Sequence, residues 1–481
     1  MNSNEKMGGT WKIYNDNTAY HGELLMDPEK RSIVLELIIT ANKNSPIPSP
    51  PYKGKIPFIC GTLFSGAKIL LYDCDAVQEH TYVGQCTRQM IYANYAFWGL
   101  TVSSSDEIRF PQVVVDFGNI ISWAKLCRYD WKSDEQGNCH LLWTHREPIK
   151  VTLNDNLQIY FCATQGTIDF NINDTQITAH QQIKVKICYN KPTSWKTILD
   201  DIKNIQYLIG LGIGQYVGVA SIEFCHESLV FESSGGSKNS TKVYNSKPAI
   251  IGTGLSRHVE QRRVIDYLYT LSQITSSNSI IEWCKKYDLL KPVLDLYFTA
   301  SSGIASTPEI LFLNLTQALE TFHSRFITNN VTEYTQRVNE IVNNFCKGQN
   351  NSYWIDFLID EGQKKNKKSI FLRTRLADLT FANGVLPFWP QAQRPDEFIR
   401  KVVHTRNYYT HYDAKKLVDS FTKEQLPYVN GYLIALLEYH ILVLLGFDPN
   451  EVRKKTVQKT KQIDDFSLIH SKTHRTKQEI K

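Results

Sequence analysis

The spacing of apolar residues changes about halfway along this chain of 481 residues. In the first half, short runs such as "SIVLELII" and "IRFPQVVVDF" are rich in β-branched and aromatic residues, and several alternate apolar with polar positions. Gly, Asn, Asp and Pro separate these runs, which is typical of half-buried strands joined by turns. From about Arg257 onward, apolar residues recur at every third or fourth position, as in amphipathic helices. The chain is therefore predicted to be an α+β protein with two domains.

The first domain is expected over residues 1–250. No internal repeat period stands out, so the strands favour an antiparallel β-rich sandwich or barrel-like domain over a repeat array. The small polar residues of "SSGGSKNSTK", residues 233–242, mark either the domain boundary or a loop within the first domain.

The second domain is expected to be an all-helical bundle over residues 251–452. Two of its helix starts are marked by a proline that acidic residues follow, at Pro308 and Pro395. The remaining residues, 453–481, are basic and polar with little to bury, so they are expected to form a flexible tail.

The composition is that of a globular protein that can touch a polyanion. A net charge of +6 permits contact with nucleic acid without demanding it. The N-terminal residues lack the apolar core of a signal peptide, which predicts an intracellular, cytoplasmic protein. The ten cysteines form no CxxC pair, as expected for free thiols in a reducing compartment. Cys139-His140 and Cys225-His226 lack the ligand spacing of a zinc site, so no bound metal is expected.

Two apolar runs and one glycine-rich run have ordinary structural interpretations. Residues 207–221 contain several glycines, and residues 432–447 contain Glu438 and His440, so both are predicted to be buried elements rather than membrane spans. The run "GLGIGQYVG" lacks the spacing of a dinucleotide site, and neither a GxSxG nor an HExxH motif occurs. We therefore expect neither a cofactor nor a membrane partner.

The densest internal charge run can be a solvated surface or a phosphate-binding surface. The solvated helix end or loop is the more ordinary interpretation. Beside a nuclease site, the same side chains would hold RNA phosphates, which supply much of nucleic-acid affinity. The residues of this basic cluster are Lys364, Lys365, Lys367, Lys368, Arg373 and Arg375.

The segment "VVHTRNYYTHYD", residues 402–413, gathers a fixed cation, an amide and two titratable bases in an amphipathic pattern. On a helix, His404, Asn407 and His411 fall on one stripe, which Glu397 and Arg400 extend. Arg406 lies about 140° around an ideal helix from His411. Both can reach one phosphate if the helix unwinds near Thr410, Tyr412 and Asp413. Alternatively, two copies of the segment meet in a symmetric dimer.

An arginine and a histidine five positions apart form a weak motif by themselves, and a surface arginine with a satisfied histidine would explain them. The residues around this arginine and histidine support a functional interpretation. The string "RNYYTH", with Arg406, Asn407 and His411, resembles the signature of the HEPN superfamily, and in particular its ApeA-like branch. "LNLTQALETFHSRF" at residues 313–326 is similar to an early helix of that branch. "GTWKIYNDNTAYHGELL" and "IPFICGTLFSGAKILLYDC" resemble strands of the ApeA N-terminal domain.

This resemblance implies a metal-independent endoribonuclease that defends bacteria against phage by abortive infection, with transfer RNA as a target class. Arg406 would stabilise charge on the phosphate, His411 would transfer a proton, and Asn407 would orient His411 or donate to the phosphate. His404 and Glu397 would have supporting roles. We further expect a homodimer or higher oligomer through the HEPN domain, and a phage-derived trigger, with the β-rich domain as sensor or regulator. A HEPN scaffold or RNA-binding module without catalysis is the alternative.

Overall fold

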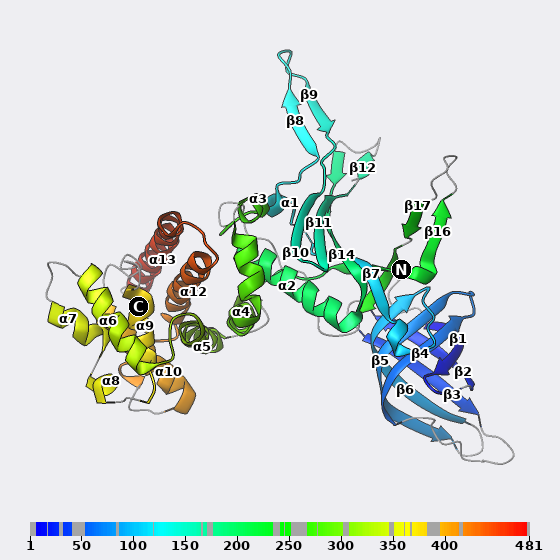
Figure 1. Cartoon of the computed structure of the whole chain (residues 1–481), viewed down its shortest axis with the longest axis horizontal. Coiled ribbons are helices and arrows are strands. Elements are labelled where there is room, and N and C mark those ends of the chain that lie inside the picture. The colour runs from blue at the N-terminus through cyan, green and yellow to red at the C-terminus, as the bar shows by residue number, and fades with distance from the viewer. Residues whose placement is uncertain are drawn as a thin grey trace. The chain divides into compact units, whose positions relative to one another are not determined.

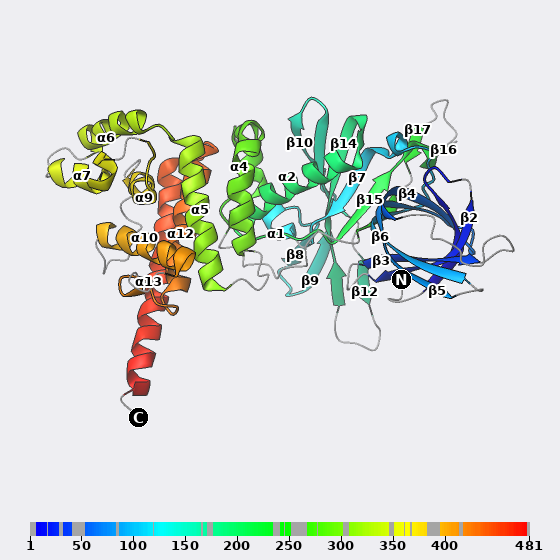
Figure 2. The same cartoon turned by 90° about the horizontal axis from the view of Figure 1, so that it is seen from below.

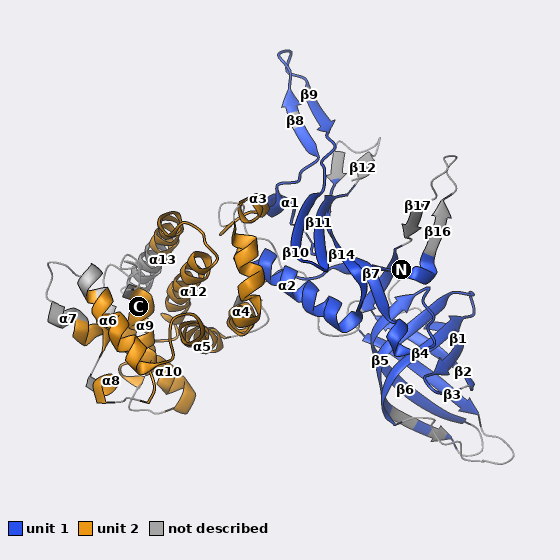
Figure 3. Cartoon of the chain, viewed as in Figure 1, with its two compact units in different colours: residues 1–210, 217–265 blue, residues 211–216, 266–481 orange. Residues whose placement is uncertain are grey.

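The computed structural model describes most of the chain and divides it into two compact units. The described residues are 6–16, 18–27, 32–40, 53–82, 86–118, 120–164, 167–170, 177–233, 241–244, 246–251, 267–276, 278–301, 307–345, 351–359, 361–365, 368–381, 395–412 and 417–478. Unit 1 contains residues 1–210 and 217–265, and unit 2 contains residues 211–216 and 266–481 (Figure 3). The division after residue 265 differs from the expected boundary after residue 250.

Six antiparallel strands of unit 1 close into a barrel, which Figure 2 shows nearly end on. Each strand pairs with the next around the ring, and β5 pairs with β6 to complete it. Trp11, Leu35 and Ile91 are fully buried in its core, because inward and outward residues alternate along each strand. In ring order the strands are β6 (Cys86–Trp98), β3 (Ser32–Thr40), β2 (Ala19–Asp27), β1 (Lys6–Ile13), β4 (Gly54–Leu63) and β5 (Lys68–Tyr82).

Glycines make room for Trp11 inside the barrel. The Trp11 indole Nε1 donates a hydrogen bond to the carbonyl oxygen of Gly22 at 3.3 Å. A Cβ atom at Gly61 would overlap the Trp11 ring. Gly61 is therefore required by the buried Trp11 side chain, whereas a Cβ atom at Gly9 would meet the backbone oxygen of Thr62.

A second arm of sheet leaves the barrel where β6 pairs with β18 at Tyr95–Phe97. Trp195 begins α2 (Trp195–Ile213) and contacts the rings of Phe97 and Phe110 edge on. Barrel and arm together confirm the predicted antiparallel β-rich domain. From the barrel outward the arm contains β18 (Lys247–Ile251), β15 (Ser221–Cys225), β7 (Arg109–Asp116), β14 (Ile183–Ser194), β11 (Leu157–Ala163) and β10 (Ile149–Asn154).

Three hairpins and three short helices complete the described part of unit 1 (Figure 1). Strand β16 ends at Ser233 and pairs with β17, which begins at Thr241, and residues 234–240 between them lie outside the described residues. Both strands belong to unit 1, so the boundary between the units does not fall at this polar segment. The hairpins are β8 (Tyr129–Ser133) with β9 (Cys139–Trp143), β12 (Thr167–Phe170) with β13 (Ile177–His180), and β16 (Val230–Ser233) with β17 (Thr241–Tyr244); the short helices are η1 (Ser105–Glu107), α1 (Ile121–Ala124) and η2 (Glu227–Leu229).

All the described secondary structure of unit 2 is helical, as predicted. Helix α12 is its central element and packs against α5 and α13 (Figure 1). Helices α5 and α10 begin at Pro308 and Pro395, as the sequence indicated. The helices are α3 (Leu271–Thr275), α4 (Ser279–Ser301), α5 (Pro308–Phe326), α6 (Val331–Phe345), α7 (Asn351–Leu358), α8 (Glu361–Lys365), α9 (Leu372–Phe381), α10 (Pro395–His411), α12 (Leu426–Leu444) and α13 (Pro449–Gln478).

Helix α12 is long and apolar enough to cross a membrane, but it is a core helix of this unit. Within its most apolar window, 72% of the residues are buried by the protein itself. Glu438 is buried in the same helix and accepts a hydrogen bond from Tyr297 at 2.7 Å. This burial agrees with the predicted interpretation of the apolar run at residues 432–447.

The expected flexible tail is corrected in its described part, because residues 449–478 form helix α13. Val452, Thr456 and Thr460 are buried, and Lys459 forms an ion pair with Glu438 of α12. Apolar and threonine residues spaced by four positions bury one face of α13. That sparse stripe is hard to recognise in a basic sequence.

Candidate functional site

Buried residues hold α10 against the core and fix the orientation of its polar face. Phe398 contacts the rings of Phe421 and Tyr432, with centroids 5.5 and 6.0 Å apart. The Thr405 hydroxyl accepts a hydrogen bond from the backbone N–H of Phe421 at 2.9 Å. Because Val402 is also buried, the helix cannot rotate without exposing apolar surface.

Helix α10 stays regular through Arg406, Asn407 and His411. It ends at His411, because Tyr412 adopts a left-handed backbone conformation with φ of 51°. Arg406 and His411 are therefore still about 140° apart around one continuous helix. Unwinding does not bring them together in this structure, and Asp413 lies outside the described residues.

Arg406 is half-exposed and has two neighbours within the unit. Its Nη1 donates to Oδ1 of Asn407 at 3.2 Å, and its Nη2 lies 3.9 Å from Oε2 of Glu320 on α5. The hydrogen bond uses the carbonyl oxygen of Asn407 and leaves the amide N–H₂ group able to donate to a ligand. A guanidinium with further donors beside an amide donor can bind phosphate oxygens.

His411 is exposed at the last position of α10. Among the described residues, no hydrogen bond or ion pair engages its ring. An exposed imidazole in this position can contact a bound molecule without first breaking a contact to the described residues.

His404 and Glu397 do not join this group within one chain. His404 Nδ1 lies 3.7 Å from Oδ2 of Asp419, which is also 3.7 Å from Nη1 of Arg400. Glu397 is exposed in the first turn of α10, and the fourteen positions to His411 correspond to about 21 Å along the helix axis. These residues do lie on the same face of α10, but they are separated along the helix axis.

The basic cluster divides into exposed lysines and a buried arginine. Lys364, Lys365 and Lys368 are exposed, and Lys364 forms an ion pair with Asp356 at 2.7 Å. Lys367 lies outside the described residues, and Arg373 is half-buried on α9. Arg375 is only 5% exposed, so its predicted contact with RNA is corrected.

Arg375 belongs to a buried polar network that the sequence analysis did not find. Its Nη1 donates to Nδ1 of His323 at 3.1 Å, and Nε2 of His323 donates to Oδ2 of Asp378 at 2.8 Å. Arg337 donates to the same carboxylate at 3.1 Å. Burial lowers the pKa of His323, so the ring is neutral and its two nitrogens have fixed donor and acceptor roles. The network joins α5, α6 and α9.

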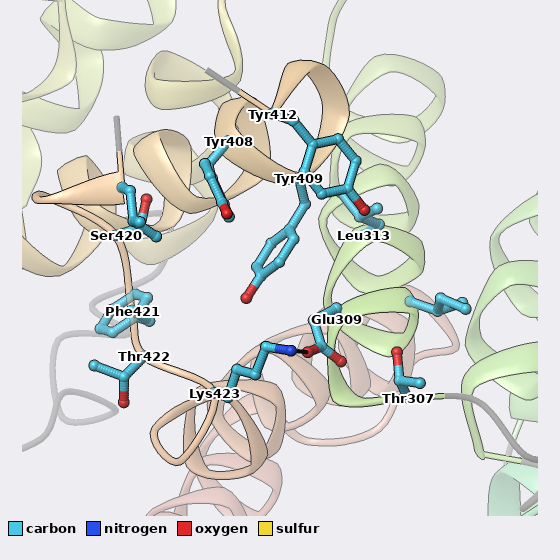
Figure 4. A pocket seen from close by; sticks show the side chains of 12 residues that line it. Thr307, Glu309, Leu313, Tyr408, Tyr409, Tyr412, Ser420, Phe421, Thr422 and Lys423 are labelled. Atoms are coloured by element: carbon cyan, nitrogen blue, oxygen red, sulfur yellow. Dashed lines mark ion pairs between the residues drawn. The ribbon is translucent and has the colours of Figure 1, made fainter. Parts of the chain in front are cut away.

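A cavity of about 640 Å³ opens beside the end of α10. Figure 4 shows Tyr409 pointing into it, above the ion pair that Lys423 makes with Glu309. The sequence motif contains the three tyrosines among the lining residues, but nothing in their spacing distinguishes a cavity from a packed core. The lining residues are Thr307, Glu309, Ile310, Leu313, Tyr408, Tyr409, Tyr412, Leu417, Ser420, Phe421, Thr422 and Lys423.

In the described part of the chain, no group of three or more His, Cys, Asp or Glu side chains could hold a metal ion. Cys225 and His226 illustrate this: the Cys225 thiol accepts from Gln112, and the His226 ring contacts Ser228 and a backbone oxygen.

Family models match both halves of the chain. Residues 6–283 match the model described as ApeA N-terminal domain 1, and residues 313–451 match the model described as Apea-like HEPN. Comparison with curated proteins and with solved structures found no match.

Proposed function

The chain belongs to the ApeA-like HEPN family, as its motifs implied, and from this premise we propose that it is a metal-independent endoribonuclease of anti-phage defence. The observation that carries the proposal is the placement of Arg406, Asn407 and His411. They occupy the last one and a half turns of α10, where the cation is half-exposed and the imidazole is unengaged by described residues.

RNA contains its own nucleophile, so the protein needs to supply only proton transfer, charge stabilisation and positioning for strand cleavage. The 2′-oxygen attacks the adjacent phosphorus while the bond from phosphorus to the 5′-oxygen breaks. One proton leaves the 2′-hydroxyl and one joins the 5′-oxygen, which gives a 2′,3′-cyclic phosphate and a 5′-hydroxyl. His411 transfers one of these protons, water transfers the other, and Arg406 stabilises the charge on the phosphorane oxygens. Asn407 donates to the phosphate.

The divergence of Arg406 and His411 around α10 supports a site shared between two protomers. In a twofold dimer of α10 helices, the arginine of one protomer approaches the histidine of its partner, and the symmetry repeats the contact. Each dimer then contains two equivalent sites. RNA cleavage would therefore require dimerisation, and a cell could regulate the activity through the dimerisation.

The β-rich unit is proposed to sense a phage-derived trigger, and transfer RNA is the proposed target class. Both proposals rest on family membership. The barrel is a closed module with its own core.

A non-catalytic HEPN scaffold is the competing function, and one observation favours it. The ion pair with Glu320 and the bond to Asn407 occupy part of the Arg406 guanidinium. A scaffold could retain Arg406 for this packing alone.

The chemistry of the cleaved ends tests the proposal. Purified wild-type protein is incubated with total bacterial RNA in EDTA, and the new ends are sequenced after treatments that distinguish cyclic phosphates from 3′-hydroxyls. We expect 2′,3′-cyclic phosphates with the wild type and none with His411→Ala. A matched control is His145→Ala, since that side chain is 69% exposed and lies in unit 1. Ends carrying 3′-hydroxyls, or cleavage by His411→Ala, would contradict the mechanism.

A further inference from the structure

We propose that the cavity at the end of α10 binds one unpaired base of the RNA and that Glu309 makes guanine the preferred base. This inference rests on the proposed function and names what the same site recognises. It concerns residues that the cleavage chemistry does not use.

The cavity has the size and lining of a ligand site. Its volume of about 640 Å³ lies within the range of roughly 300–1,000 Å³ typical of small-molecule sites. The first turn of α5, the last turn of α10 and residues 417–423 enclose it. The ring of Tyr408 lies 5.0 Å from that of Tyr409 and 5.8 Å from that of Tyr412, measured between centroids.

The cavity is adjacent to the proposed cleavage residues along the helix. Tyr408 follows Asn407, and Tyr412 follows His411. Tyr408 therefore lies about 100° around α10 from Asn407, and the ring of Tyr412, which directly follows the end of the helix, contacts the Tyr408 ring. A nucleotide whose base enters the cavity would place its sugar and phosphate beside Asn407 and His411.

Aromatic side chains favour a nucleobase as the occupant. Unpaired bases stack on tyrosine rings, and this contact accepts every base because each has a π-face. Tyr412 is 73% exposed, which is unusual for a large aromatic side chain and leaves its ring accessible to a ligand.

A phosphate is the wrong ligand for the polar end of the cavity. Lys423 Nζ lies 3.4 Å from Oε1 of Glu309, so the cation already has a carboxylate partner. A hydrogen bond from Thr307, and to a lesser degree Lys423, lower the pKa of Glu309. The ionised carboxylate repels phosphate and accepts hydrogen bonds from N–H groups.

Guanine satisfies this acceptor best among the four bases. Its Watson–Crick edge has N1–H and N2–H₂ side by side, and two parallel N–H donors match the two oxygens of a carboxylate. Adenine and cytosine have an amino group beside an acceptor nitrogen, and uracil has one N–H between two carbonyl oxygens. Glu309 therefore discriminates for guanine, while the tyrosines supply affinity.

Binding by full-length His411→Ala protein tests the inference without cleavage. The probes are fluorescein-labelled uridine heptamers with either one central guanine or one central adenine, and the readout is the Kd by anisotropy. We expect the guanine probe to bind roughly tenfold more tightly. Adding Glu309→Gln should abolish this preference, and adding Tyr409→Leu with Tyr412→Leu should weaken both probes roughly tenfold.

Tyr428→Leu is the matched control, since Tyr428 is half-buried in unit 2 and does not line the cavity. It should leave both Kd values unchanged. Equal binding of the two probes, or binding that the tyrosine substitutions do not affect, overturns the inference even if the wild type cleaves RNA. Wild-type protein that cleaves no RNA but binds as described defeats the proposed function and leaves the inference standing.

Discussion

Arg406 Nη2 and Glu320 Oε2 lie 3.9 Å apart, in a pair whose two side chains are each about one-third exposed. A pair at that distance and exposure contributes at most about 1 kcal/mol, so a phosphate can displace the carboxylate. In the free protein, Glu320 therefore holds the guanidinium beside α5 and competes with RNA for it.

We expect Glu320→Gln to strengthen RNA binding, because the competing negative charge is removed while the side-chain shape is kept. The KM for RNA should fall by about two- to fivefold, which corresponds to less than about 1 kcal/mol. Glu340→Gln is the control, since Glu340 is exposed on α6. Loss of activity in Glu320→Gln would mean that Glu320 takes part in the reaction instead.

The four lysines of the basic cluster are expected to contribute to RNA binding. Changing Lys364, Lys365, Lys367 and Lys368 together to Gln should weaken RNA binding and flatten its dependence on salt, since each lost phosphate contact reduces the slope by about 0.7 for single strands. Fluorescence anisotropy across a salt series measures this slope. An unchanged slope and Kd would remove these lysines from the RNA-binding surface.

The Asp378 carboxylate is expected to be essential for folding of unit 2. Asp378→Asn leaves the Arg337 guanidinium and the Nε2–H of buried His323 without their charged acceptor. The free energy of unfolding in urea should fall by about 3–5 kcal/mol. Asp356→Asn removes an exposed carboxylate and should change it by no more than about 0.5 kcal/mol. Equal effects of the two substitutions would disprove this role for the network.

The pH dependence of stability should report on His440, which is buried and donates from Nε2 to the Leu379 carbonyl oxygen at 2.6 Å. Burial lowers its pKa from 6.5 to about 4. The unfolded chain therefore binds a proton that the folded chain does not bind between these values, and stability falls as the pH drops through this window. The loss approaches about 3 kcal/mol.

Urea unfolding at pH 7.5, 6.0 and 4.5 measures this effect. His440→Gln, which keeps a donor but cannot titrate, should lose this part of the pH slope, whereas His145→Gln should retain it. A slope that is the same in wild type and His440→Gln would assign the effect to other groups.

The sequence predicted what depends on local spacing. Alternation along β3 and β7 and the three-to-four spacing of α5 and α10 are properties of neighbouring residues, and both halves have the predicted class. The branch of β6, which joins barrel and arm, arises from pairings with β18 more than 150 residues away along the chain. No local pattern encodes such a pairing.

The site residues also divide into those that local sequence spacing predicts and those that depend on contacts between distant parts of the chain. Arg406, Asn407 and His411 were predicted as a group because they lie within six residues of one predicted helix and match the signature of the HEPN superfamily. The burial of Arg375 depends on His323 and Asn329, which lie on another part of the chain and accept its hydrogen bonds. The cavity depends in the same way on Glu309 and Lys423, which are far apart in sequence and meet only in the folded unit.

Complementation between two inactive variants tests the central claim most directly, namely that Arg406 of one protomer acts with His411 of its partner. Arg406→Ala and His411→Ala are co-expressed, and RNA cleavage is compared with that of each variant alone. With random pairing, half of the dimers are mixed, and each mixed dimer contains one intact site of two. We therefore predict about one quarter of wild-type activity from the mixture and none from either variant alone. A mixture that forms mixed dimers but cleaves no RNA would contradict the account.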